Sequence, residues 1–163
     1  MQEFVYYAPT EIIFGKNAES QTGKEIRKWG GNRVLIVYGG GSVKKSGLLG
    51  RIEEELKQEK IAFLEWGGVK PNPRLSFAEA GIKEALVFGA DFILAVGGGS
   101  SIDTAKAIAH GTANPENGLW DIWTGKAPLE KSLPVGVVLT ISAAGSEMSD
   151  SAVLTNEETG RKQ

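Results

Sequence analysis

The chain has 163 residues with 18 basic and 20 acidic side chains, and its net charge of −2 argues against a nucleic-acid or membrane-surface partner. It contains no cysteine, which excludes disulfides, iron–sulfur clusters and thiolate zinc sites. No apolar run approaches the roughly 20 residues that span a bilayer, and the first residues carry no signal-peptide pattern, so we expect a cytoplasmic protein without a membrane partner.

The first half of the chain predicts strands that alternate with helices. Residues 4–15 are rich in β-branched and aromatic side chains, and they predict a short amino-terminal β-hairpin whose two strands join at Pro9. Apolar periodicity and the positions of glycine and proline predict the next elements. In chain order these are a helix over 20–29, a buried strand over 33–41, an amphipathic helix over 46–59, a strand over 61–66 and a loop over 67–74.

The second half of the chain continues this alternation. We expect a helix over 76–90 with Phe77, Ile82, Ala85 and Leu86 facing inward, a strand over 91–96, a helix over 100–111 that stops at Gly111, an irregular segment over 114–132 and a strand over 133–142. This order predicts an α/β fold, doubly wound around a mostly parallel sheet. The charged end of the chain has no closing element, so we expect a chain cut short from a longer protein.

Three of the expected strands end in clusters of glycine, serine and threonine, at 39–42, 97–100 and 140–146. In an open parallel sheet the carboxyl ends of the strands lie at the edge where ligands bind. Glycine lets a ligand approach the backbone, and the helix expected from Ser100 points its positive end to the same place. The pattern favours an anion such as a pyrophosphate. The alternative is that the glycines only make tight turns, and that Ser100 and Asp103 form a helix cap without a ligand.

The common nucleotide-binding fingerprints do not match these loops. The G-x-G-x-x-G pattern would need a glycine at position 44 or 102, where the chain has Lys44 and Ile102. The phosphate-loop pattern G-K-[ST] fails as well, because Ala127 follows Gly125 and Lys126. The site is therefore neither a classical dinucleotide fold nor a P-loop.

Four motifs in this order resemble the iron-dependent, or group III, alcohol dehydrogenase family, and in particular its butanol dehydrogenase-like, broad aldehyde reductase branch. They are YGGGSVKKSG at 38–47, PNP at 71–73, GGGSSIDTAK at 97–106 and LTISAAGSEMS at 139–149. The resemblance implies that residues 1–163 form an NAD(P)-binding domain of the dehydroquinate synthase-like type. It also implies a helical carboxyl-terminal domain, absent from this chain, in which one aspartate and three histidines hold iron or zinc.

The resemblance assigns cofactor-binding residues to this chain but no catalytic or metal-binding residue. The assigned residues are Gly39, Gly40, Gly41 and Ser42 in the first loop, Asn72 between two prolines, Gly97, Gly98, Gly99 and Ser100 around the pyrophosphate, Asp103 near the nicotinamide, Thr140, Ser142 and Ser146 along the adenine, ribose and phosphate, Leu154 against the cofactor, and Lys162 at the ribose. Three alternatives stay open. Asn72 only makes a turn, Leu154 only packs in the core, or Lys162 is disordered at the chain end.

The residues of the first loop favour NADP(H) over NAD(H). A carboxylate at this place would bind the ribose 2′-hydroxyl and repel a 2′-phosphate. The loop has no acid and is followed by Lys44 and Lys45. The alternative is that both lysines are ordinary solvated residues at the start of a helix.

The remaining aromatic and imidazole side chains give weaker signals. His110 is the only histidine, and its place at the end of a helix predicts a structural role and not metal binding. Trp120 and Trp123 lie in the irregular segment, either in the core or on a face that a second domain covers.

The resemblance implies that the full-length enzyme transfers hydride between NAD(P)H and a small-molecule primary alcohol or aldehyde. This chain alone is expected to be inactive. The alternatives are an NAD- and metal-dependent lyase domain like dehydroquinate synthase, or a stand-alone nucleotide-binding module. A homodimer through the amino-terminal strands is also implied, and exposed edge strands favour such pairing.

Overall fold

The computed structural model describes residues 7–163, and its centre is a four-stranded sheet with all strands parallel. The strands are β1 (Arg33–Tyr38), β2 (Ala62–Gly67), β3 (Phe92–Gly97) and β4 (Val135–Leu139), and their order across the sheet is β2-β1-β3-β4. The predicted α/β fold with a parallel sheet is confirmed. Strands β1 and β3 lie in the middle and are buried on both faces, which explains their continuous apolar sequences.

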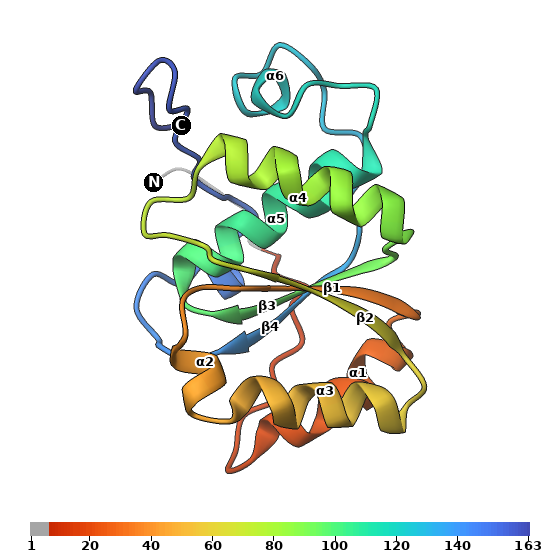
Figure 1. Ribbon diagram of the computed structural model, residues 1–163. Coiled ribbons are helices and arrows are strands. Elements are labelled where there is room, and N and C mark those ends of the chain that lie inside the picture. Colours follow the sequence, from red (N-terminus) through yellow and green to blue (C-terminus); the bar gives the residue numbers. More distant parts are fainter. Residues whose placement is uncertain (1–6) are drawn as a thin grey trace.

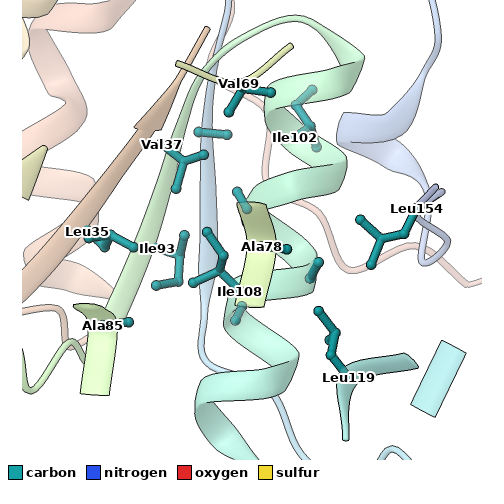
Figure 2. Close-up of a cluster of buried hydrophobic side chains, with 14 of the residues drawn as sticks. Leu35, Val37, Val69, Ala78, Ala85, Ile93, Ile102, Ile108, Leu119 and Leu154 are labelled. Atoms are coloured by element: carbon teal, nitrogen blue, oxygen red, sulfur yellow. The ribbon is translucent and has the colours of Figure 1, made fainter. Parts of the chain in front are cut away.

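Helices cover both faces of the sheet, as Figure 1 shows. Helices α1 (Thr22–Lys28) and α3 (Leu48–Gln58) lie on one face, and α4 (Leu75–Phe88) and α5 (Gly99–Ala113) lie on the other. Alternate residues of β1 therefore belong to two different core clusters. Ile36 packs with Ile52 of α3, whereas Leu35 packs with Ile108 of α5. Figure 2 shows the cluster that contains Leu35, and Ile102, Ile108, Leu119 and Leu154 point into it.

Short helices occupy three segments that the sequence did not predict as helical. They are α2 (Ser42–Lys45), α6 (Leu119–Trp123) and the 3-10 helix η2 (Ser146–Met148), and a further 3-10 helix η1 (Ala18–Gln21) precedes α1. Helix α6 corrects the prediction of an irregular segment over 114–132. Leu119 and Ile122 are buried, so this segment forms a helical turn because two apolar side chains reach the core.

The predicted amino-terminal β-hairpin is wrong for the part that the structure describes. Residues 7–14 form no strand, and Ile12 and Phe14 are 62% and 99% exposed. The residues have the composition of strands, but among residues 7–163 no neighbouring strand pairs with them. The first predicted strand lies largely outside the described residues. On α4, Ala85 is buried as predicted, whereas Leu86 is 45% exposed and faces away from the sheet.

Gly111 does not end its helix, because α5 continues to Ala113. The helix ends where Asn114 donates hydrogen bonds to the carbonyl of His110 from its backbone N–H (3.1 Å) and its side-chain Nδ2 (2.7 Å). Gly111 has a packing role, since a Cβ atom there would overlap Cδ1 of Ile82 on α4. Glycine at this position lets α4 and α5 approach each other closely.

Substitution Gly111→Ala is expected to lower the free energy of unfolding by about 1 kcal/mol. Overpacking costs about 1–3 kcal/mol, which exceeds the gain of about 1 kcal/mol that alanine brings to a helix. Gly50→Ala on α3 is the matched control, because nothing lies within 4 Å of a Cβ there, and it is expected to stabilise. Urea unfolding of both variants measures the difference. Equal stabilisation by both substitutions would contradict the packing role of Gly111.

Candidate functional site

The candidate site lies at the carboxyl edge of the sheet, between β1 and β3. The chain leaves β1 toward α2 and α3 on one face and leaves β3 directly into α5 on the other face (Figure 1). Neighbouring strands whose connections run to opposite faces leave a crevice at their ends, which is where open α/β sheets bind ligands. This edge is the place that the glycine clusters predicted.

The structure brings the three predicted loops together at this edge. A Cβ on Gly39 would lie 3.9 Å from Oγ of Ser101, which joins the first loop to the start of α5. A Cβ on Gly98 would lie 2.7 Å from Cγ2 of Ile141, and the N–H of Thr140 donates to the carbonyl of Gly97 at 3.1 Å. Loops 39–42, 97–100 and 140–146 are therefore neighbours in space.

Glycine occupies the positions in these loops for different physical reasons. Gly97 has φ of 153°, and a Cβ there would lie 2.6 Å from Oγ of Ser101, so both conformation and space require glycine. Gly98 and Gly99 are crowded by the loop that follows β4. In contrast, nothing lies within 4 Å of a Cβ on Gly40, so internal packing does not require glycine there. The first loop is the one whose backbone is open to a ligand.

The start of α5 faces the same edge without a side-chain cap. Its N-cap is Gly98 in an extended conformation, and no side chain makes a capping hydrogen bond there. A helix of 15 residues with a free first turn carries partial positive charge there. The alternative in which Ser100 and Asp103 form a cap is wrong, because Ser100 lies inside the helix and Asp103 bonds elsewhere.

Asp103 holds the segment that follows β4 instead. Its Oδ1 accepts a hydrogen bond from the hydroxyl of Ser146 at 2.6 Å, and its Oδ2 accepts one from the backbone N–H of Val153 at 3.3 Å. Ser146 is only 7% exposed. The side chain of Ser146 therefore supports its own loop, and a direct contact of that side chain with a cofactor remains a prediction that this burial does not favour.

Lys106 is a residue of this site that the sequence analysis missed. Its Nζ donates hydrogen bonds to the carbonyls of Ser146 (2.7 Å), Ser149 (2.7 Å) and Ser151 (2.8 Å), and it lies 3.2 Å from Oγ of Ser146. Burial lowers the pKa of Lys106, and Asp103 and other nearby carboxylates oppose that shift. A signal was present in the sequence, since a lysine three residues after an aspartate lies on the same helix face.

The chain end forms a small hairpin beside the PNP loop. Leu154 and Gln163 exchange backbone hydrogen bonds of 2.9 and 3.0 Å, and the N–H of Thr155 donates to the carbonyl of Pro73 at 2.7 Å. Leu154 is fully buried in the core cluster of Figure 2, as its structural alternative predicted. The hairpin places each of these residues at a defined position relative to loop 67–74.

The same hairpin joins two predicted cofactor residues. Nζ of Lys162 donates a hydrogen bond to Oδ1 of Asn72 at 3.1 Å, so the side chain of Lys162 has a defined place. Asn72 has φ of 57°, the left-handed conformation that asparagine tolerates in turns. Asn72 therefore makes a turn and also presents a polar side chain, and its two interpretations are compatible.

A charged cluster lies beside the first loop. Oε2 of Glu65 on β2 accepts a hydrogen bond from the hydroxyl of Tyr38 at 2.6 Å and forms an ion pair with Nζ of Lys44 at 2.8 Å. Lys44 lowers the pKa of Glu65, and Glu65 raises the pKa of Lys44. The sequence analysis found no acid at this place because Glu65 comes from the neighbouring strand.

Lys45 differs from Lys44 in its surroundings. Among residues 7–163 no salt bridge involves Lys45. A Cβ on Gly41 would lie 3.8 Å from Cε of Lys45, so this side chain runs along the open glycine loop. The positive charge of Lys45 is therefore available to a ligand at the loop.

The side chains of His110, Trp120 and Trp123 make contacts within the fold and do not lie at the candidate site. Nδ1 of His110 lies 2.9 Å from the hydroxyl of Ser132, its ring lies 5.7 Å from that of Trp123, and burial lowers its pKa. Trp120 and Trp123 pack against the core cluster, and Nε1 of Trp123 donates to the carbonyl of Ala152 at 3.2 Å. These contacts support the structural role predicted for His110.

The described part of the chain offers neither a metal site nor a membrane-spanning helix. Residues 7–163 contain no group of three or more histidine, cysteine, aspartate or glutamate side chains placed to hold a metal ion. No helix within this range is both long and apolar enough to cross a membrane.

Comparison with known proteins agrees with the motifs at this edge. The family model described as iron-containing alcohol dehydrogenase matches residues 9–163. Probable NADH-dependent butanol dehydrogenase 2 of Bacillus subtilis is 48% identical over 99% of this chain and 41% of its own length. NADPH-dependent aldehyde reductase YqhD of Escherichia coli is 41% identical over 100% of this chain and 42% of its own length.

The fold of solved relatives is the same. The crystal structure of NADH-dependent butanol dehydrogenase A from Thermotoga maritima superposes with a TM-score of 0.95 at 45% identity, covering 99% of this chain and 40% of the other. The chain thus spans about two fifths of the length of the relatives it matches, and it corresponds to their amino-terminal part. The open glycine loop, the uncapped helix and the collinear motifs are accounted for together, because this chain belongs to the iron-containing alcohol dehydrogenase family.

Proposed function

We propose that this chain is the NAD(P)-binding domain of an enzyme that transfers hydride between NAD(P)H and a primary alcohol or aldehyde. The observation that carries the proposal is the open loop 39–42 beside the uncapped start of α5, at the ends of adjacent parallel strands. Relatives described as butanol dehydrogenases and an aldehyde reductase support the substrate class. The bound nicotinamide would supply the hydride.

The residues of this edge would divide the nucleotide between them. The backbone N–H groups at Gly99 and Ser100 and the positive end of α5 would bind the pyrophosphate. Thr140 and Ser142 are exposed beside them and would contact the adenosine half. Asn72 and Lys162, already hydrogen-bonded to each other, would present one donor group to a ribose. Asp103 would act near the nicotinamide by holding the loop of Ser146.

The chemistry of hydride transfer would need residues beyond this domain. The family implies a divalent metal, iron or zinc, but the residues that the structure describes offer no group of three ligands for it. We therefore propose that the metal is held by another part of a longer protein and that this chain alone is inactive.

We also propose that the protein acts in the cytoplasm as a homodimer that pairs through its amino-terminal segments. The exposed apolar side chains of Tyr7, Ile12 and Phe14 in this one segment support this proposal, because apolar side chains that gather on a surface are typical of interaction sites.

The chain is expected to bind NADPH about fivefold more tightly than NADH, with Lys45 as the cause. An exposed ammonium that meets a phosphate contributes about 1 kcal/mol, which corresponds to about fivefold. Calorimetric titration of the chain with each cofactor measures this ratio. The variant Lys45→Gln is expected to bring the ratio near one and to leave the affinity for NADH unchanged.

Lys83→Gln is the matched control, because Lys83 is an exposed lysine in the middle of α4 and far from the loop in sequence and element. It is expected to leave both affinities unchanged. Binding of neither cofactor at millimolar concentration would contradict the proposed function of this chain, and it would also exclude a stand-alone nucleotide-binding module. An equal loss of both affinities in Lys45→Gln would contradict recognition of the 2′-phosphate by this side chain.

A further inference from the structure

The cluster of Tyr38, Lys44 and Glu65 lies beside the open loop but takes no part in the binding roles assigned above. Tyr38 is the last residue of β1, Lys44 lies in α2 directly after the loop, and Glu65 lies on the neighbouring strand β2. One oxygen of Glu65, Oε2, bonds both other side chains, at 2.6 Å to the hydroxyl of Tyr38 and at 2.8 Å to Nζ of Lys44. Three elements of the fold therefore meet at one carboxylate oxygen.

The backbone of β2 makes room for this arrangement. Gly67 ends the strand, and a Cβ there would overlap the ring of Tyr38. The ring can therefore lie flat against the end of β2, with its hydroxyl directed to Glu65. Nζ of Lys44 lies 5.3 Å from the centre of the same ring, a distance at which the aromatic face attracts a cation. Lys44 is held from two sides.

The positive charge of Lys44 is therefore already balanced by the negative charge of Glu65. Its pKa is raised first by the hydrogen bond with Glu65 and then by Tyr38, while the pKa of Glu65 is lowered first by Lys44. Both groups are charged near neutral pH and satisfy each other. A phosphate that approaches the loop meets a carboxylate beside the first lysine, and then the second lysine, Lys45, which forms no salt bridge with any of residues 7–163.

We propose that Glu65 is a specificity-determining residue, which limits the affinity of this site for a nucleotide 2′-phosphate by holding Lys44 in an ion pair. The proposal rests on the proposed nucleotide-binding function of the same edge. Glu65 acts in two ways that reinforce each other. It withdraws one cation from the phosphate, and its own negative charge repels the phosphate. A ribose 2′-hydroxyl has no charge and the pyrophosphate is common to both cofactors, so both effects act more strongly on NADPH than on NADH.

The test is the substitution Glu65→Gln, followed by calorimetric titration of the chain with NADPH and with NADH. Glutamine keeps the size of the side chain and an oxygen that accepts from Tyr38, but it removes the negative charge. NADPH is expected to bind about fivefold to tenfold more tightly than to the unchanged chain, and the dissociation constant for NADH is expected to stay within about twofold.

Two further variants separate the ion pair from a general charge effect. Glu54→Gln removes one negative charge from α3, where Glu54 pairs with Lys57 at 2.6 Å, and it is expected to leave the ratio of NADPH to NADH affinity unchanged. In the double variant Lys44→Gln with Glu65→Gln, the gain in NADPH affinity is expected to be largely lost. That loss would show that the gain depends on the ammonium of Lys44, which Glu65→Gln frees from its ion pair.

Three other outcomes are possible, and each contradicts either the role of Glu65 or the proposed function. An unchanged ratio in Glu65→Gln, with NADH still bound, overturns the role of Glu65 and leaves the proposed function intact. Loss of NADH affinity in Glu65→Gln would mean that Glu65 contacts the ribose hydroxyl directly, which also overturns the role proposed here. Failure of the unchanged chain to bind either cofactor overturns the proposed function of this chain and this inference with it.

Discussion

Replacing Gly97 by alanine is expected to lower the free energy of unfolding by about 3 kcal/mol, as the sum of strain of about 1–3 kcal/mol and overpacking of about 1–3 kcal/mol. Gly97 ends β3 with φ of 153°, which favours glycine, and an added Cβ would lie 2.6 Å from Oγ of Ser101. Relief of the clash must move the start of α5 away from β3. NADPH binding is therefore expected to weaken by more than about tenfold.

Urea unfolding and calorimetric titration of Gly97→Ala measure these two effects. Gly125→Ala is the matched control, because Gly125 also has a positive φ of 72° but nothing lies within 4 Å of a Cβ there. It is expected to cost about 1 kcal/mol and to leave NADPH affinity unchanged. If Gly97→Ala binds NADPH as the unchanged chain does, the start of α5 is not part of the nucleotide site.

The second large effect is expected for Lys106→Met, which keeps the apolar stem and removes the ammonium. The carbonyls of Ser146, Ser149 and Ser151 lose their common donor. Hydrogen bonds to a charged group contribute about 1.5–3 kcal/mol each, but solvent reaches the bonds to Ser149 and Ser151, so we expect a total loss of about 2 kcal/mol in the free energy of unfolding. NADPH affinity is expected to fall about tenfold, because the loop after β4 loses its position.

Amide hydrogen exchange distinguishes this local effect from general destabilisation. Residues 145–153 are expected to exchange faster in Lys106→Met, while the amides of β1 and β3 keep their protection. Lys106→Arg is expected to recover part of the protection, because arginine also carries several donors. Lys83→Met on the exposed side of α4 serves as the control. Unchanged exchange over residues 145–153 would show that Lys106 does not hold this loop.

The elements predicted from local sequence are those whose apolar patterns are complete within one segment. Residues 34–37 and 92–97 carry no charged or polar side chain, because both faces of the central strands are covered, and this pattern has few other interpretations. The end of α5 was misjudged at Gly111, because a glycine in a helix has the same appearance whether it ends the helix or lets another helix approach. Only the position of Ile82 on α4 separates the two.

The sequence predicted the parts of the candidate site that are formed by loop backbone. It did not predict the side chains whose role depends on contacts with other segments of the fold. The three glycine loops were identified because each directly follows a strand. Glu65 was missed because its role comes from the pairing of β2 with β1, which places a residue 21 positions after Lys44 beside it. Lys106 was missed because its three acceptors are backbone carbonyls, and its spacing from Asp103 indicates only a shared helix face and not these acceptors.

The amino-terminal prediction failed for a related reason. Strand composition predicts that a segment can pair, but pairing also needs a neighbour. Residues 7–14 have the composition of a strand, but within residues 7–163 no neighbouring strand pairs with them.

Helix α5 combines two roles in one element, because it faces the proposed phosphate position and also holds the loop that follows β4. Its first turn faces the proposed phosphate position, while Asp103 and Lys106, one and two turns later, hold the loop that follows β4. If this edge binds a nucleotide as proposed, binding and loop order would be thermodynamically linked, so a ligand that favours the ordered loop would itself be favoured by it to the same extent. Part of the binding free energy would then come from the hydrogen bonds by which Asp103 and Lys106 hold this loop.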